Sequence, residues 1–116
     1  MKKYILAMLL LNSSLVMADG PYDGIWSSQA GYFALHENAG TIIAVRLLSD
    51  HSTWEAFIAP RDGNSFTLES LISDVSIVID ITMTSDTTFS AIQVSCAPTY
   101  LCDFPSGTRF SGNKVW

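Results

Sequence analysis

The fold of this chain is indicated by one segment near its middle, which reads Val75-Ser76-Ile77-Val78-Ile79-Asp80-Ile81-Thr82-Met83-Thr84. Apolar and polar side chains alternate along this segment, with Val78 as the exception. A period of two residues, rich in β-branched side chains, is typical of a β-strand with one buried face. The pattern therefore predicts a strand that turns Ile77, Ile79 and Ile81 toward the core.

Seven other segments have strand-like composition and are separated by short turns. They lie at 24–26, 32–37, 41–48, 53–59, 65–71, 87–96 and 108–116. Consecutive strands with tight connections pair antiparallel, and such a series most simply closes into an up-and-down barrel, which leaves no exposed edge. The chain is therefore predicted to be all-β, a small closed or nearly closed meander of about eight strands. A two-sheet β-sandwich of the same strands is the alternative.

The first 18 residues predict a bacterial Sec-type signal peptide. Met1-Lys2-Lys3 is basic, the following run to Leu11 is apolar, and Ala18 supplies the small residue at the cleavage position. The apolar run is too short to span a bilayer. We therefore expect cleavage after Ala18, export to the periplasm or the medium, and a single domain over residues 19–116.

The charge of the chain excludes some classes of partner. Six basic residues stand against 11 acidic ones, and loss of Lys2 and Lys3 with the signal peptide would leave four against 11, a net charge of −7. The four are Arg46, Arg61, Arg109 and Lys114. They are scattered and form no basic patch for phosphates, so we expect neither a nucleic-acid partner nor stable insertion into a membrane.

Cys96 and Cys102 enclose five residues near the end of the chain. In an exported protein such a pair most often forms a structural disulfide. In the chain-entropy model, closing so small a loop stabilises the fold by roughly 2–2.5 kcal/mol. Strict alternation along 87–96 puts Cys96 on the face of Val94 and on the face opposite Gln93.

Gly24-Ile25-Trp26 opens the first predicted strand, and this G-x-W motif resembles the opening of calycin barrels, the lipocalins and avidins. The sequence that follows, Gly31-Tyr32-Phe33 to Val45, is also similar to secreted bacterial modules that begin with Gly-Leu-Trp and continue as a β-meander. The resemblance implies a barrel whose bottom is closed by Trp26. It further implies a binding or inhibitor protein rather than an enzyme.

Residue types that could support catalysis are few in this sequence. Asp50-His51-Ser52 contains the residues of a hydrolase triad, but neighbours on a turn point apart and form no relay. His36-Glu37 lies at a strand end, where consecutive side chains face opposite sides. No H-x-H or C-x-x-C spacing and no glycine-rich phosphate loop occurs, so we expect no metal and no cofactor.

Five carboxylates could supply an acid–base pair, and most of them are expected to be ordinary outward-facing charges. They are Glu37, Glu55, Glu69, Asp74 and Asp80. Asp80 is the residue to watch, because it lies in mid-strand between Ile79 and Ile81. On the barrel exterior it would blunt edge pairing, whereas burial of Asp80, or of His36, would mark a site.

The function that this pattern favours is an exported, non-enzymatic binding module. It would recognise another protein or hold a small apolar ligand, with Trp26 and Trp54 as candidate ligand-contacting or barrel-closing aromatics. A small secreted hydrolase using Asp or Glu and His is one alternative. A minor outer-membrane-associated component is another, suggested by the aromatic Trp116 at the end of the last predicted strand.

Overall fold

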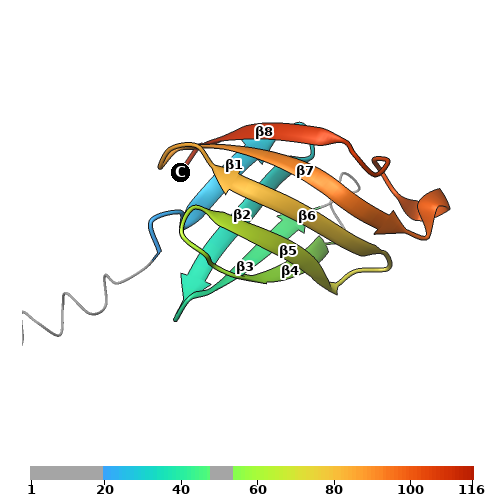
Figure 1. Ribbon diagram of the computed structural model, residues 1–116, viewed down its shortest axis with the longest axis horizontal. Helices are drawn as coiled ribbons and strands as arrows, with labels where there is room; N and C mark the ends of the chain where they lie inside the picture. Colours follow the sequence, from blue (N-terminus) through green and yellow to red (C-terminus); the bar gives the residue numbers. More distant parts are fainter. Residues whose placement is uncertain (1–19, 48–53) are drawn as a thin grey trace, which may run out of the picture.

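The computed structural model describes residues 20–47 and 54–116 of the chain. The predicted signal peptide and the segment Asp50-His51-Ser52 lie outside these residues. The described residues form eight strands and one short 3₁₀ helix (Figure 1). They are β1 (Gly24–Ser28), β2 (Gly31–Asn38), β3 (Thr41–Leu47), β4 (Trp54–Pro60), β5 (Ser65–Ile72), β6 (Ser76–Met83), β7 (Thr88–Ala97), η1 (Thr99–Leu101) and β8 (Arg109–Lys114).

Each strand pairs antiparallel with the next, and β8 returns to pair with β1, so the sheet closes into a barrel. The prediction of a closed up-and-down meander is confirmed, and the β-sandwich alternative is wrong. Closure requires a close approach at Gly112, which faces Ser28 across the β1–β8 pair. A Cβ at Gly112 would collide with the backbone oxygen of Ser27 and the ring of Phe89. Only glycine lets these two strands meet without a shift.

The segment that indicated the fold forms β6. Its alternation holds in three dimensions, because Ile77, Ile81 and Met83 are buried while Asp80 is exposed on the outer face. The strand lies between β5 and β7, and the pairing of Thr67 with Asp80 sets its register on one side. The β-branched side chains of β6 thus lie on a strand with one buried face, as the sequence predicted.

A β-bulge changes the alternation along β7. The register with β6 shifts, so that Val78 faces Ser95 while Ile79 faces Gln93. An extra residue on one strand reverses the faces of the residues beyond it. As a result Gln93 and Cys96 are both buried on the inner side, and the prediction that they face opposite sides is wrong.

The two ends of the barrel interior differ. At the end that carries the C-terminus, the buried side chains of Trp26, Ile42, Phe66 and Met83 fill the space. Trp26 is fully buried, packs edge-to-face on Phe89 at 5.8 Å and donates from Nε1 to the backbone oxygen of Tyr22 at 2.9 Å. The connection between β7 and β8, with η1, lies at the opposite end (Figure 1).

In the described part of the chain, no helix is long and apolar enough to cross a membrane.

Candidate functional site

The opposite end of the barrel is hollow. A cavity of about 600 Å³ lies between the inner faces of the strands, and its walls are mainly aromatic and aliphatic. Among the lining side chains are Phe33, Phe57, Leu68, Ile79 and Phe110. Small-molecule sites in proteins commonly have volumes of about 300–1,000 Å³ and apolar walls with a few polar groups. The cavity therefore has the size and the lining of a ligand site.

Small inward-facing residues explain why this end is hollow. Ala44 on β3 and Ala91 on β7 line the cavity at positions where a larger side chain would occupy it, and Ala30 lies beside its opening. The inward residues of the filled end are mostly larger, with Trp26 and Phe66 among them. An eight-stranded barrel is just wide enough for side chains to fill or for one small ligand to bind. Here the choice of alanines leaves the space.

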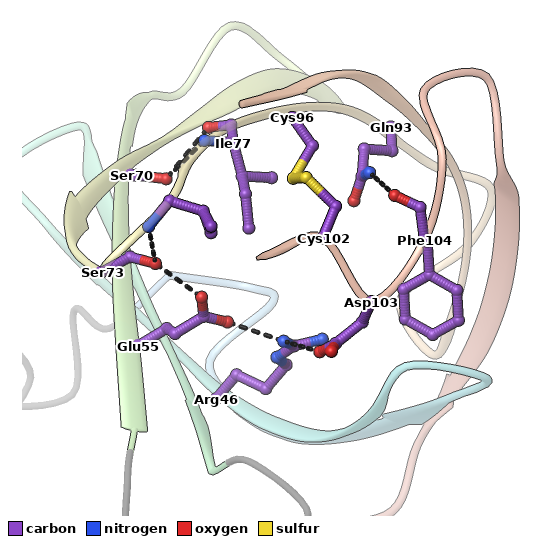
Figure 2. Close-up of polar contacts among 11 residues, drawn as sticks. Arg46, Glu55, Ser70, Ser73, Ile77, Gln93, Cys96, Cys102, Asp103 and Phe104 are labelled. Atoms are coloured by element: carbon purple, nitrogen blue, oxygen red, sulfur yellow. Dashed lines mark hydrogen bonds and ion pairs between the residues drawn. A yellow bond between two sulfur atoms is a disulfide. The ribbon is translucent and has the colours of Figure 1, made fainter. Parts of the chain in front are cut away.

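An ion pair lies inside the barrel near the opening of the cavity. Arg46 on β3 and Glu55 on β4 are directly opposite in the register of these strands, and Arg46 Nη2 lies 2.7 Å from Glu55 Oε1. Glu55 is only 5% exposed. Its second oxygen, Oε2, accepts a hydrogen bond of 2.6 Å from the Ser73 hydroxyl, which in turn accepts one from the backbone N–H of Val75 (Figure 2). Each oxygen of the buried carboxylate therefore has a partner, as a buried charge requires.

The connection between β7 and β8 folds over the opening and adds a second carboxylate. Asp103 Oδ2 lies 3.1 Å from the same Nη2 of Arg46, and the Asp103 side chain is 63% exposed. Figure 2 shows Asp103 turned toward the guanidinium, with the Cys102–Phe104 segment inside the ring of strands. Arg46 is thus shared between a buried carboxylate and an exposed one.

A disulfide and a buried amide hold this connection in place. Cys96 and Cys102 are bonded, which confirms the predicted disulfide. Gln93 Nε2 donates to the backbone oxygen of Phe104 at 2.7 Å, and the Phe104 ring packs edge-to-face on Phe110 at 5.0 Å. The disulfide acts at the start of the connection and the amide hydrogen bond acts beyond it. Both fix Asp103 at the opening.

Large apolar side chains stand at the rim of the opening. Trp54, Ile72 and Leu101 line the cavity, yet each leaves about half of its surface exposed. They come from β4, β5 and η1, so three separate segments contribute to one apolar rim. Exposed apolar groups beside a cavity are typical of sites that receive a ligand or a partner.

The aromatic residues singled out from the sequence have different positions. Trp54 is at the cavity rim. Trp26 does not line the cavity but lies at the filled end, where the calycin resemblance implies a closing tryptophan. The two tryptophans are therefore not brought together around one ligand.

Asp80 and His36, the two titratable residues singled out from the sequence as site candidates, lie outside the cavity. Asp80 is exposed on the barrel exterior and accepts a hydrogen bond of 2.7 Å from Thr67 Oγ1. His36 is 60% exposed and lies 3.1 Å from Asp23 on the outer surface. Nearby, the Glu37 carboxylate lies 2.7 Å from Arg61 Nε, and this contact raises the pKa of the Arg61 guanidinium. Within residues 20–47 and 54–116, no three His, Cys, Asp or Glu side chains are grouped to hold a metal.

Sequence reasoning singled out Asp80 and missed Arg46, and it gave Glu55 no special role. A signal for Glu55 exists, because it is an even number of residues from Phe57 and Ala59, which are buried. For Arg46 the local signal is weak, since the residues around it are apolar on both faces of the strand. Its inward position becomes evident only when β3 is paired with β4.

Comparison of the chain with protein-family models, with curated proteins and with solved structures found no match. The features of the structure that bear on function are the cavity, its rim and the polar groups at its opening.

Proposed function

We propose that this protein is an exported binding protein that holds a small apolar ligand inside its barrel. The single observation that carries the proposal is the hollow end of the barrel, a cavity of about 600 Å³ with mainly apolar walls. Burying apolar surface against such walls is favourable by about 25 cal/mol per Å². The proposed activity is binding and not catalysis.

Two further features support this proposal. The closed antiparallel barrel is compatible with a calycin-like barrel, and the opening G-x-W motif of that family resembles Gly24-Ile25-Trp26. The Cys96–Cys102 bond is of the kind that persists in oxidising compartments. A ligand carrier that works outside the cytoplasm would have both a closed barrel and a structural disulfide.

Ligand binding can be tested with N-phenyl-1-naphthylamine, a neutral apolar dye whose emission rises when it leaves water. The Ala44→Trp variant places an indole in the cavity. We expect it to weaken dye binding by at least about tenfold, which is about 1.4 kcal/mol. Ala34→Trp is the matched control, because Ala34 is exposed on the neighbouring strand β2 and points outward. This control should bind the dye within about twofold of the unmodified protein.

Circular dichroism and thermal unfolding establish that both variants are folded before binding is compared. A folded Ala44→Trp protein that binds the dye as well as the Ala34→Trp control would contradict binding in the cavity. Native mass spectrometry of the protein purified from its exporting host gives an independent measurement. A bound apolar molecule that is absent from Ala44→Trp supports the proposal.

Recognition of another protein is the second candidate, and the apolar rim favours it. Trp54 and Leu101 are half-exposed beside the carboxylates of Asp74 and Asp103, which is the composition of a small interface with a polar edge. Trp54→Ser should then abolish a specific cross-link to a partner while dye binding persists. Tyr32→Ser, which removes an exposed aromatic from the barrel wall, is the matched control.

A further inference from the structure

The polar groups around the opening of the cavity have an excess of negative charge. Among the described residues that line it, Arg46 is the one cation, against the carboxylates of Glu55, Asp74 and Asp103, a formal balance of −2. Nη2 of Arg46 is already shared between Glu55 and Asp103. The excess of carboxylates among these residues disfavours a ligand with a carboxylate or phosphate end, and Nη2 of Arg46 is already occupied, although Arg46 Nε is buried without a partner among the described residues.

The buried amide of Gln93 points to the same class of ligand. Gln93 is 4% exposed, and its Nε2 donates to the backbone oxygen of Phe104. Because a carbonyl only accepts, this bond identifies which atom of the amide is nitrogen and which is oxygen. The Oε1 atom points away from the barrel wall toward the interior (Figure 2), and no hydrogen bond to it comes from the described residues. The buried side chain thus presents an acceptor to the cavity.

We propose that the ligand is an apolar amine, with its hydrocarbon or aromatic body in the cavity and its ammonium group at the opening. This inference rests on the proposed binding function and specifies its ligand class. An ammonium group has three donors and no acceptor, which complements the Asp103 carboxylate at the opening. Gln93 Oε1 is a further acceptor in the lining of the cavity. The Asp103 side chain is mostly exposed, so the cation stays partly hydrated while the apolar body is buried. The indole of Trp54 at the rim adds a surface that attracts cations.

Three compounds with the same ten-carbon chain and different ends test the inference. Decylamine, decan-1-ol and decanoate compete with N-phenyl-1-naphthylamine for the protein at pH 7.5, where the amine is cationic and the acid anionic. We expect decylamine to displace the dye at a concentration at least about tenfold lower than decanoate, with decan-1-ol between them. Added salt should weaken decylamine and leave decan-1-ol unchanged.

Substitutions at Asp103 identify the group responsible. Asp103→Asn keeps an oxygen beside Arg46 and removes one negative charge, so it should reduce the preference for decylamine over decanoate by at least about threefold. Asp103→Lys should reverse the preference. Asp86→Asn and Asp86→Lys make the same charge changes at an exposed position in the turn between β6 and β7, at the filled end. These controls should leave the order of the three compounds unchanged.

The outcomes separate this inference from the proposed function. If the dye and decan-1-ol bind but decanoate binds as tightly as decylamine, the amine inference is overturned and cavity binding stands. If the Asp103 and Asp86 variants behave alike, the preference arises from the net charge of the protein, and the inference is again overturned. If neither the dye nor any of the three compounds binds, the proposed function itself fails.

Discussion

Arg46 and Glu55 face each other across β3 and β4 inside the barrel, with Arg46 Nη2 2.7 Å from Glu55 Oε1. Removing two charges from water costs several kcal/mol, and the pair repays this only when its remaining atoms are satisfied. Ser73 donates to the second oxygen of Glu55, and Asp103 accepts from Arg46 Nη2, whereas Arg46 Nε is buried without a hydrogen-bond partner among the described residues. The pair therefore connects β3, β4, the β5–β6 turn and the β7–β8 connection at the opening of the cavity.

Loss of one member of this pair is expected to cost more than loss of both. Arg46→Met leaves the buried Glu55 carboxylate without its cation, so the free energy of unfolding should fall by about 3–5 kcal/mol. The double variant Arg46→Met with Glu55→Leu should lose clearly less, because no buried charge remains. Urea unfolding of the single and double variants measures both values.

Arg109 is exposed, so Arg109→Met serves as the control. It should change the free energy of unfolding by no more than about 0.5 kcal/mol. Additive losses in the double variant would show that the two charges do not act as a pair.

Closure of the barrel should depend on the absence of a side chain at Gly112. Gly112→Val would force the backbone of Ser27 and the ring of Phe89 apart, and we expect a loss of at least about 1–3 kcal/mol, the usual cost of overpacking. Asn113→Val adds a β-branched residue at the next, outward-facing position of β8 and should change stability little. Thermal unfolding compares them, and equal unfolding temperatures would contradict a tight β1–β8 contact.

The disulfide should stabilise the fold and hold the β7–β8 connection over the cavity. Thiol titration of the unreduced protein should detect no free thiol. Cys96→Ala with Cys102→Ala should lower the free energy of unfolding by roughly 2–2.5 kcal/mol in the chain-entropy model. The bond ties the start of the β7–β8 connection, next to Asp103, to β7. Loss of the bond should therefore also make dye release faster, which stopped-flow fluorescence measures. An unchanged release rate would show that the connection does not control access.

Export should remove the first 18 residues. The intact mass of the protein recovered outside the cytoplasm is expected to correspond to residues 19–116, with Asp19 as the new N-terminus. Ala18→Asp places a charge at the cleavage position and should block processing, whereas Ser14→Asp lies farther from it and should not. A mature protein that still begins at Met1 would contradict the signal-peptide prediction.

The candidate site shows how far sequence patterns extend. The inward positions of Ala44 and Ala91 can be read from the sequence once the strands are placed. The same holds for Glu55, which is two residues from Phe57 and therefore on the same face of its strand. By contrast, the bulge in β7 is invisible to a strict period of two, and it alone brings Cys96 to the inner side with Gln93. The attention given to Asp80 followed from its mid-strand position, but its side chain points to Thr67 on the exterior.

The sequence by itself determined the strands, their meander and the disulfide, because alternation, turn residues and a short cysteine spacing act between near neighbours in the chain. Only the tertiary structure decided that Arg46 meets Glu55, that Asp103 returns over the opening, and that one end of the barrel is filled while the other is hollow. These relationships join residues up to 57 positions apart. They depend on strand register and barrel closure, which no local pattern specifies.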